Sequence, residues 1–382
     1  MKKKTKFWRW IIGLTAVTII MNLLGCMQAF CDLYKKTVYG VISDALGILT
    51  SWIPFPLGEI LGYLGVLAVV FGLVVLVLLL FLRGKAGYRR FAAGYGKGFL
   101  FGIVLLLFVY TLNWILPFRG SILKVEGAAE RNYTLQEVQN VRNYIVSEIN
   151  KAAEEVTRDE NGSVIYNHAA MEKATASAMR AQADKLPLLS GFYPRMKDAL
   201  CSDFLEWMDI GGYTYPYTME ITWNLYCNDL YYPFLFAHES AHHQGYYQEN
   251  EANYVAFLAC TQSDDPLIRF AGYNEIYYYL NNAYIETLYN SLEKEEATAL
   301  YKQQPHVSMQ VMRDRSDAYL AAQERYEAVS HPAQKLETVS TQVADVGWST
   351  QADLLQENSY DGVVKMVLQY YDVAFDGLQD LP

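Results

Sequence analysis

From residue 238 to residue 253 the chain reads HESAHHQGYYQENEAN, which contains the pattern H-E-x-x-H. If this stretch is helical, His238 and His242 lie one turn apart and project from the same face, so both imidazoles reach one metal ion. Glu239, beside the first histidine, is then placed to take a proton from metal-bound water. The stretch predicts a site for one Zn²⁺ per chain, with Glu239 as its catalytic base.

A catalytic zinc site generally has three protein ligands and a water molecule, so a third ligand is needed. Gly245 predicts a turn, after which a second helix begins near Gln248 and brings Glu249 back towards the histidines. Glu249 is the predicted third ligand. Glu251 is the alternative, but about 200° of helical rotation separates the two glutamates, so both cannot face the ion. Asn253 shares the face of Glu249, and we expect it to accept a hydrogen bond from a ligand imidazole.

Two short strands are predicted before this site, over residues 213–217 and 220–226, because aromatic and β-branched residues alternate there. We expect the second strand to form an edge along which an extended substrate peptide pairs. Glu220 and Asn224 fall on one face of that strand. They are candidates for contacts with a substrate amine or backbone, although ordinary strand polarity explains them equally well.

The rest of the chain after residue 119 is predicted to be mainly helical. Thr134 and Glu137 form a capping-box pattern at the start of a helix. Gly211-Gly212 is expected to end another helix. Further helices are expected at about 134–156, 167–186, 232–243, 248–260, 266–300, 307–329 and 361–377.

Three long runs carry no charged residue: Trp10–Cys31, Ile60–Leu82 and Gly98–Phe118. Each is long enough to cross a hydrocarbon core about 30 Å thick. The first run is also compatible with a cleaved signal peptide, but because two more runs follow it, an anchor that stays in place is favoured. The chain is therefore predicted to be a multi-pass membrane protein whose partner is the lipid bilayer.

Charge divides the chain sharply. Residues 1–118 contain 12 basic and 3 acidic residues, and residues 119–382 contain 19 basic and 38 acidic residues. Basic clusters at residues 2–6 and 83–90 flank the apolar runs, which predicts a cytoplasmic N-terminus and an extracytoplasmic C-terminal domain. Lys35 and Lys36 run against this rule. The acidic C-terminal part argues against nucleic acid as a partner.

The five cysteines form no C-x-x-C pair and no even framework. A single Cys201–Cys227 disulfide outside the cell and free buried thiols remain open as alternatives.

The motif also resembles that of known enzymes. The pattern H-E-x-x-H followed by E-N-E-A-N is similar to that of gluzincin metallopeptidases, especially the membrane-bound CAAX-prenyl-endopeptidase type, in which H-E-x-x-H precedes E-x-E-A-D. In that family the first glutamate of the second motif is the ligand, which corresponds to Glu249. Asn253 replaces the family's aspartate and removes one negative charge beside the ligands.

A closer resemblance, along nearly the whole chain, is to an uncharacterised bacterial family of membrane proteins known only as a domain of unknown function. Besides the histidine motif, the similar segments are residues 54–59 (PFPLGE), 212–220 (GYTYPYTME) and 359–364 (SYDGVV). This resemblance implies a zinc-peptidase-like domain attached to membrane spans, in a bacterial cell membrane. It implies no particular substrate.

The predicted fold is a membrane domain (1–118) with three transmembrane helices at about 10–31, 60–82 and 98–118, followed by a helical brace or lid (119–190) and a mainly α-helical, zincin-like α+β domain with a small sheet (191–382). The predicted function is hydrolysis of a peptide amide bond in a peptide or protein substrate. The alternatives are a non-catalytic binding or scaffold protein with a structural metal, and a zinc amidase acting on cell-wall material. Glu239 separates these classes, because a structural site has no use for that carboxylate.

Overall fold

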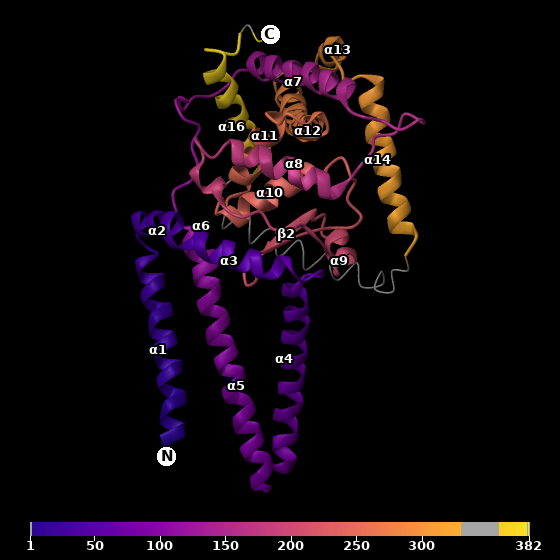
Figure 1. Cartoon of the computed structure of the whole chain (residues 1–382). Helices are drawn as coiled ribbons and strands as arrows, with labels where there is room; N and C mark the ends of the chain where they lie inside the picture. The colour runs from indigo at the N-terminus through magenta and orange to yellow at the C-terminus, as the bar shows by residue number, and fades with distance from the viewer. Residues whose placement is uncertain (1, 330–358, 380, 382) are drawn as a thin grey trace. The chain divides into compact units, whose positions relative to one another are not determined.

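The computed structural model describes residues 2–329, 359–379 and 381, and most of them are helical (Figure 1). The chain forms two compact units. The first comprises Met1–Ser121 together with Thr214–Glu220, and the second comprises Ile122–Tyr213 and Ile221–Pro382. The short segment Thr214–Glu220 thus belongs to the first unit, although its neighbours in sequence belong to the second.

The first unit contains long apolar helices. Among the described residues, three helical stretches are long and apolar enough to cross a membrane, and they overlap the three predicted apolar runs: Lys6–Leu24, Leu57–Leu82 and Ala86–Phe118. They lie in α1 (Lys2–Leu24), in α4 (Leu57–Leu82), and in α5 (Ala86–Tyr110) with its continuation through the π-helix η2 (Thr111–Ile115) into α6 (Leu116–Phe118).

The boundaries of these helices differ from those expected from charge-free runs. The first helix ends at Leu24 rather than Cys31. The next residue, Gly25, packs so closely against Leu116 that an added Cβ would lie 2.7 Å from the Leu116 side chain. The third begins at Ala86 rather than residue 98, since charged residues at its start do not stop a helix. A helical stretch formed by α2 (Gln28–Tyr34), the π-helix η1 (Lys35–Tyr39) and α3 (Gly40–Ser51) runs across the long helices (Figure 1).

The segment Thr214–Glu220 supplies the cap of α4. The buried Glu220 carboxylate accepts hydrogen bonds from the backbone N–H groups of Leu57 (3.0 Å) and Gly58 (2.7 Å). It also accepts one from the Thr218 hydroxyl (2.6 Å). The first N–H groups of a helix have no partner within the helix, and a negative charge there complements the helix dipole. The carboxylate that we expected to be available to a substrate is therefore occupied by three donors.

Two further contacts hold this segment. The ring of Tyr215 lies against Gly58, where a Cβ would come within 2.3 Å of it. Asn113, in the π-helix η2, donates a hydrogen bond from its side chain to the carbonyl of Pro216 (2.8 Å). The glycine in the PFPLGE segment is thus required by an aromatic ring about 160 residues later in the chain.

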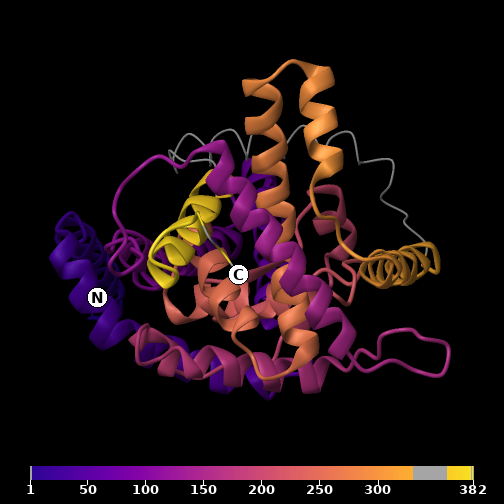
Figure 2. The ribbon, with the colours of Figure 1, turned by 90° about the horizontal axis from the view of Figure 1, so that it is seen from above.

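The second unit is built around α11 (Glu249–Thr261), which is buried from Glu251 to Thr261. This helix packs against helices from four other regions of the unit: α8 (His168–Ala181), α10 (Tyr232–Gln244), α12 (Pro266–Ser291) and α16 (Ser359–Ala374). On the outside, α7 (Leu135–Glu155) lies along α12 (Figure 2). The remaining helices are η3 (Pro187–Ser190), α9 (Ser202–Trp207), α13 (Lys294–Gln303) and α14 (Met309–Glu327).

Several predicted helices are present with altered ends. The capping box of α7 is confirmed, because the Thr134 side chain accepts from the Glu137 N–H and the Glu137 carboxylate accepts from the Thr134 N–H. The helix expected over 266–300 is two helices, since α12 ends at Ser291 and α13 begins at Lys294. All five cysteines are free, including Cys201 and Cys227.

A small sheet completes the fold. Its strands are β1 (Lys197–Asp198), β2 (Gly212–Tyr215) and β3 (Glu220–Trp223), in the order β1-β3-β2, with β1 parallel to β3. The prediction that the strand beginning at Glu220 is an edge for a substrate peptide is therefore wrong, because β3 lies between the other two. All four of its residues are buried, as is typical of a central strand.

We expect Glu220→Ala to lower the stability of the first unit by about 2 kcal/mol, because it leaves two buried N–H groups of α4 without their acceptor. The midpoint of thermal unfolding in detergent should fall by several degrees. Glu126→Ala, which removes an exposed carboxylate, is the control and should leave the midpoint unchanged. Equal midpoints for the two variants would contradict the capping role.

Candidate metal centre

The candidate site is formed by α10 and α11 and by the turn between them. Pro233 occupies the first turn of α10, where its missing N–H is tolerated. At the other end, Gly245 has a φ of 106°, a left-handed conformation that favours glycine and ends the helix. The chain reverses there, and α11 begins at Glu249 and packs against α10. The predicted turn at Gly245 is confirmed.

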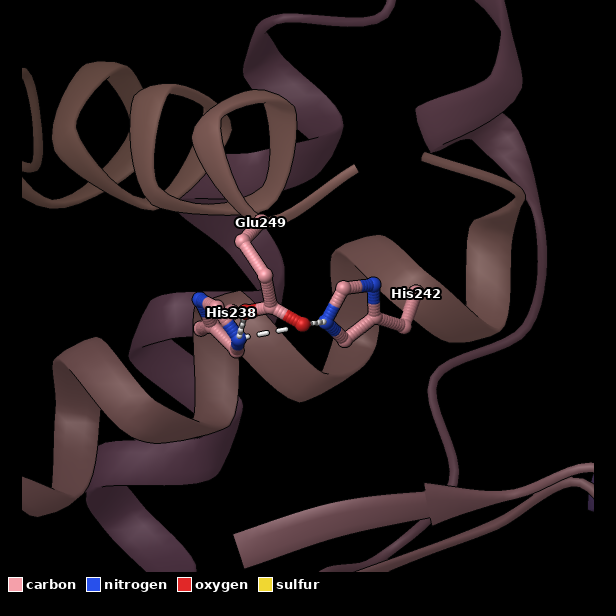
Figure 3. A group of neighbouring side chains, drawn as sticks. All are labelled: His238, His242 and Glu249. Atoms are coloured by element: carbon pink, nitrogen blue, oxygen red, sulfur yellow. Dashed lines mark hydrogen bonds and ion pairs between the residues drawn. The ribbon is translucent and has the colours of Figure 1, made fainter. Parts of the chain in front are cut away.

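This reversal brings His238, His242 and Glu249 together (Figure 3). The Glu249 carboxylate lies 3.3 Å from Nε2 of His238 and 3.6 Å from Nε2 of His242. The two Nε2 atoms are 3.1 Å apart. One ligand atom from each residue lies within 4.8 Å of the others, an arrangement that could hold a metal ion. The three side chains come from two helices and point toward one another (Figure 3).

Hydrogen bonds fix the orientation of both imidazoles. Nδ1 of His238 lies 2.8 Å from Oδ1 of Asn253, and Nδ1 of His242 lies 2.8 Å from the carbonyl oxygen of Tyr246. Both partners are acceptors, so each Nδ1 carries a proton, and in the neutral imidazole the lone pair is on the Nε2 that faces the centre of the group. The contact of Asn253 with His238 was expected from the spacing of the residues. The contact of His242 with the Tyr246 carbonyl was not expected, because every residue has a backbone carbonyl and the sequence does not show which one lies near the ring.

The charges of the group favour a cation between the three side chains. Burial lowers the pKa of His242, but the neighbouring Glu249 carboxylate outweighs this effect and raises the pKa to about 9. Burial raises the pKa of Glu249, whereas the two histidines hold it well below its usual range. A proton or a metal ion would therefore be stabilised here.

Of the two glutamates considered for the third ligand position, Glu249 faces the histidines and Glu251 does not. Glu251 is buried, and its carboxylate accepts hydrogen bonds from the backbone N–H groups of Gln248 (3.1 Å) and Leu123. It forms a capping box with Gln248 at the start of α11. The role of Glu251 is thus to cap the helix that presents Glu249.

Glu239 directly follows His238 in α10 and contributes to the electrostatic field of the group. Its negative charge is one of the causes that raise the pKa of His242. The Glu239 residue is buried, whereas the Glu249 side chain is 38% exposed and that of His238 is 12% exposed. The group therefore opens to the outside at Glu249 and is closed at Glu239.

Gly211 and Gly212 have a function that the sequence did not indicate. They follow α9 by several residues, so they do not end a helix. A Cβ on Gly211 would lie 2.8 Å from the ring of Tyr231, and one on Gly212 would lie 2.3 Å from the backbone oxygen of Thr222 in β3. Gly211 thus allows the chain before β2 to pack against the residue that precedes α10, and Gly212 allows the close approach of β2 to β3.

Asn224, another candidate for substrate contact, is used within the protein. Its side chain donates to the Glu206 carboxylate (2.7 Å) and accepts from the Tyr226 N–H (3.1 Å). It lies just after β3 and is buried. These bonds give Asn224 a role in fixing the loop that leads to α10.

Glu275, on α12, is a further buried acid in this unit. Burial raises its pKa to about 7, against the opposing effects of a hydrogen bond from Asn274 (2.9 Å) and the charge of Arg315. Its charge is also one of the causes that raise the pKa of Tyr231, the residue that precedes α10. The ionised form of Glu275 is therefore destabilised in the folded protein.

We expect the second unit to lose stability as the pH rises from about 4.5 to about 7, because the folded state holds the Glu275 proton over that range and the unfolded state does not. Glu275→Gln should remove this loss. The variant should be more stable than the parent by about 2 kcal/mol at pH 8, a value reduced for partial exposure, and equally stable at pH 4. Denaturant unfolding at both pH values measures the difference. Equal stability at pH 8 would show that the carboxylate ionises without penalty.

Comparison with known proteins places the chain in a family. Residues 34–367 match the model of a family described as "Protein of unknown function (DUF3810)". No curated protein and no solved structure matches the chain. The family match covers most of both units and all the residues of the candidate metal centre. The chain therefore belongs to the DUF3810 family of proteins of unknown function.

Proposed function

We propose that the protein is a membrane-anchored, zinc-dependent metallopeptidase that hydrolyses a peptide amide bond. One observation supports this most strongly: two imidazole Nε2 atoms and the Glu249 carboxylate converge (Figure 3), and Glu239 directly follows His238 in the same helix. Two histidines and one glutamate form the ligand set of well-known zinc peptidases. The resemblance of the motif to gluzincins supports the same function.

The chemistry of the donors fits zinc. Zinc prefers imidazole nitrogen and carboxylate oxygen in tetrahedral sites, and catalytic sites leave the fourth position to water. When bound, the ion would lower the pKa of that water and polarise the substrate carbonyl group. His238, His242 and Glu249 would hold it, and Asn253 and the Tyr246 carbonyl would keep both imidazoles in the correct tautomer.

The proposed role of Glu239 is proton transfer. Its carboxylate would accept the proton of the attacking water and later deliver it to the leaving amine, so that the carboxylate is regenerated for the next turnover. Burial of Glu239 keeps bulk water away from this proton, while the exposed side of Glu249 leaves room for a substrate. These two features favour a catalytic site over a structural one, which is generally closed by four protein ligands.

The proposed location follows from charge. The turn between α4 and α5 carries the exposed residues Arg83, Lys85, Arg89 and Arg90. The positive-inside rule places such a turn on the cytoplasmic side. Three crossings from a cytoplasmic N-terminus then leave the second unit outside the cytoplasm, where a peptide, a protein or a cell-wall amide is available as a substrate.

We expect purified protein to contain one zinc ion per chain and Glu249→Ala to lower zinc affinity at least about 100-fold, because a carboxylate ligand is lost. Asn253→Ala should lower it about 10- to 100-fold, because the ring of His238 loses its orienting acceptor. Glu296→Ala, which removes an exposed carboxylate in α13, is the control and should keep one zinc per chain. Metal analysis by mass spectrometry with competitive chelation gives these values. Full occupancy in Glu249→Ala would refute the assigned ligand set.

Glu239→Gln should retain zinc and lower the rate of amide hydrolysis by a factor of about 10² to 10⁴, because the amide cannot accept the proton. Cleavage of a peptide library and of muropeptides, compared between the parent and the variant, is the measurement. Cleavage of muropeptides alone would identify a cell-wall amidase. A variant as active as its parent on every substrate would refute catalysis and leave a protein with a structural metal.

A further inference from the structure

The helical stretch Gln28–Ser51, made of α2, η1 and α3, has an inverted distribution of polar and apolar residues. A helix on the surface of a water-soluble protein buries its apolar face and exposes its polar face. Here the residues that face the protein are mostly small or polar, and those that face outward are mostly apolar. Such an inversion indicates that the surroundings of the helix are apolar.

The outward face is clearest in α3 and just after it. Val41 is 69% exposed, Leu49 is 66% exposed and Trp52 is 86% exposed. Ala45 and Ile48 are also exposed, so the positions 41, 45, 48, 49 and 52 follow the helical period. Among residues 28–51, the one exposed charged residue is Lys36, whose long side chain can reach toward an interface.

The inward face shows the opposite composition. In η1 and α3 its buried residues are Lys35, Tyr39, Ser43, Gly47 and Thr50. In a protein surrounded by water the side chains of Lys35, Ser43 and Thr50 would be expected on the outside. Lys35 is one of the two lysines that conflict with the charge rule, and its burial means that it does not count as a charge free to interact with the membrane surface.

The serine and threonine hydroxyl groups of this stretch find acceptors within the helix itself. Ser43 donates to the carbonyl of Gly40 (3.1 Å), and Thr50 donates to that of Leu46 (2.8 Å). The exposed Thr37 donates to the carbonyl of Leu33 (2.6 Å). These groups therefore need no water, which is the condition for placing them in hydrocarbon.

Both ends of the stretch join membrane-spanning candidates. Three residues separate Gln28 from the end of α1, and five separate Ser51 from the start of α4. The start is also fastened to the end of the third apolar helix, because the Asp32 carboxylate accepts from the backbone N–H and the hydroxyl of Ser121, both at 2.6 Å. The stretch thus lies next to the C-terminal end of α1, the N-terminal end of α4 and the C-terminal end of the third apolar helix.

We propose that Gln28–Ser51 is a fourth membrane element, which lies along one leaflet with its apolar face against lipid acyl chains. Lipid is the occupant that the structure favours, because α1 and α4, the two helices that the stretch connects, also expose many large apolar side chains. Trp52, at the end of the stretch, has the side chain that is enriched at the level of the headgroups. The stretch would anchor the outer ends of the spanning helices in the plane of the bilayer.

The test uses the full chain in phospholipid nanodiscs, with the photoreactive residue benzoylphenylalanine at single positions. Val41 and Leu49 are the test positions. Leu67, an exposed residue of α4, is the positive control for lipid contact, and Met309, an exposed residue of α14 in the second unit, is the negative control. After irradiation, mass spectrometry distinguishes the free chain, a chain with one phospholipid attached and a covalent dimer.

We expect lipid adducts at positions 41 and 49 at a yield within about twofold of that at position 67, and at least tenfold less at position 309. Adducts at position 67 alone would overturn the proposal, because they would show that the apolar face of Gln28–Ser51 contacts water or protein rather than lipid. A dimer crosslinked through positions 41 and 49 would also overturn it and identify a second copy as the occupant. Since these substitutions replace exposed apolar residues, a single peak in size exclusion is the check that each variant folds.

Discussion

The candidate site depends on one constraint: the imidazoles of α10 and the carboxylate at the start of α11 must meet within a few ångströms. Gly245 allows this, because its left-handed backbone reverses the chain within one turn of His242. The Asn253 side chain and the Tyr246 carbonyl then fix the rings, and Glu251 fixes the first turn of α11. Three independent contacts thus position three ligand atoms, which is how a metal site gains affinity before the ion arrives.

Much of this geometry follows from spacing along the chain. His238, His242, Glu249 and Asn253 were predicted to meet because a helix repeats every 3.6 residues and glycine permits the turn between two helices. Glu251 was considered as a ligand, because sequence spacing alone does not show which glutamate is needed as a cap. Its partners are backbone N–H groups, and one of them belongs to Leu123, far away in the sequence.

The features that sequence reasoning missed are those that depend on distant segments. Glu220 was expected in contact with substrate, and β3 was expected at an edge, because local alternation reveals neither the partners of a strand nor its place in a sheet. The apolar runs indicated the three long helices but not their ends, since α5 includes charged residues at its start and the first helix ends before the charge-free run does. The sequence analysis also did not predict α3, whose buried residues include Ser43 and Thr50.

The cap of α4 has a consequence for the order of events during biosynthesis. Leu57 and Gly58 leave the ribosome about 160 residues before Glu220 does, so the helix enters the bilayer before its final acceptor exists. Until then, water or lipid headgroups must bind these two N–H groups. The first unit can therefore be completed only after the segment that contains Glu220 has been translated and folded.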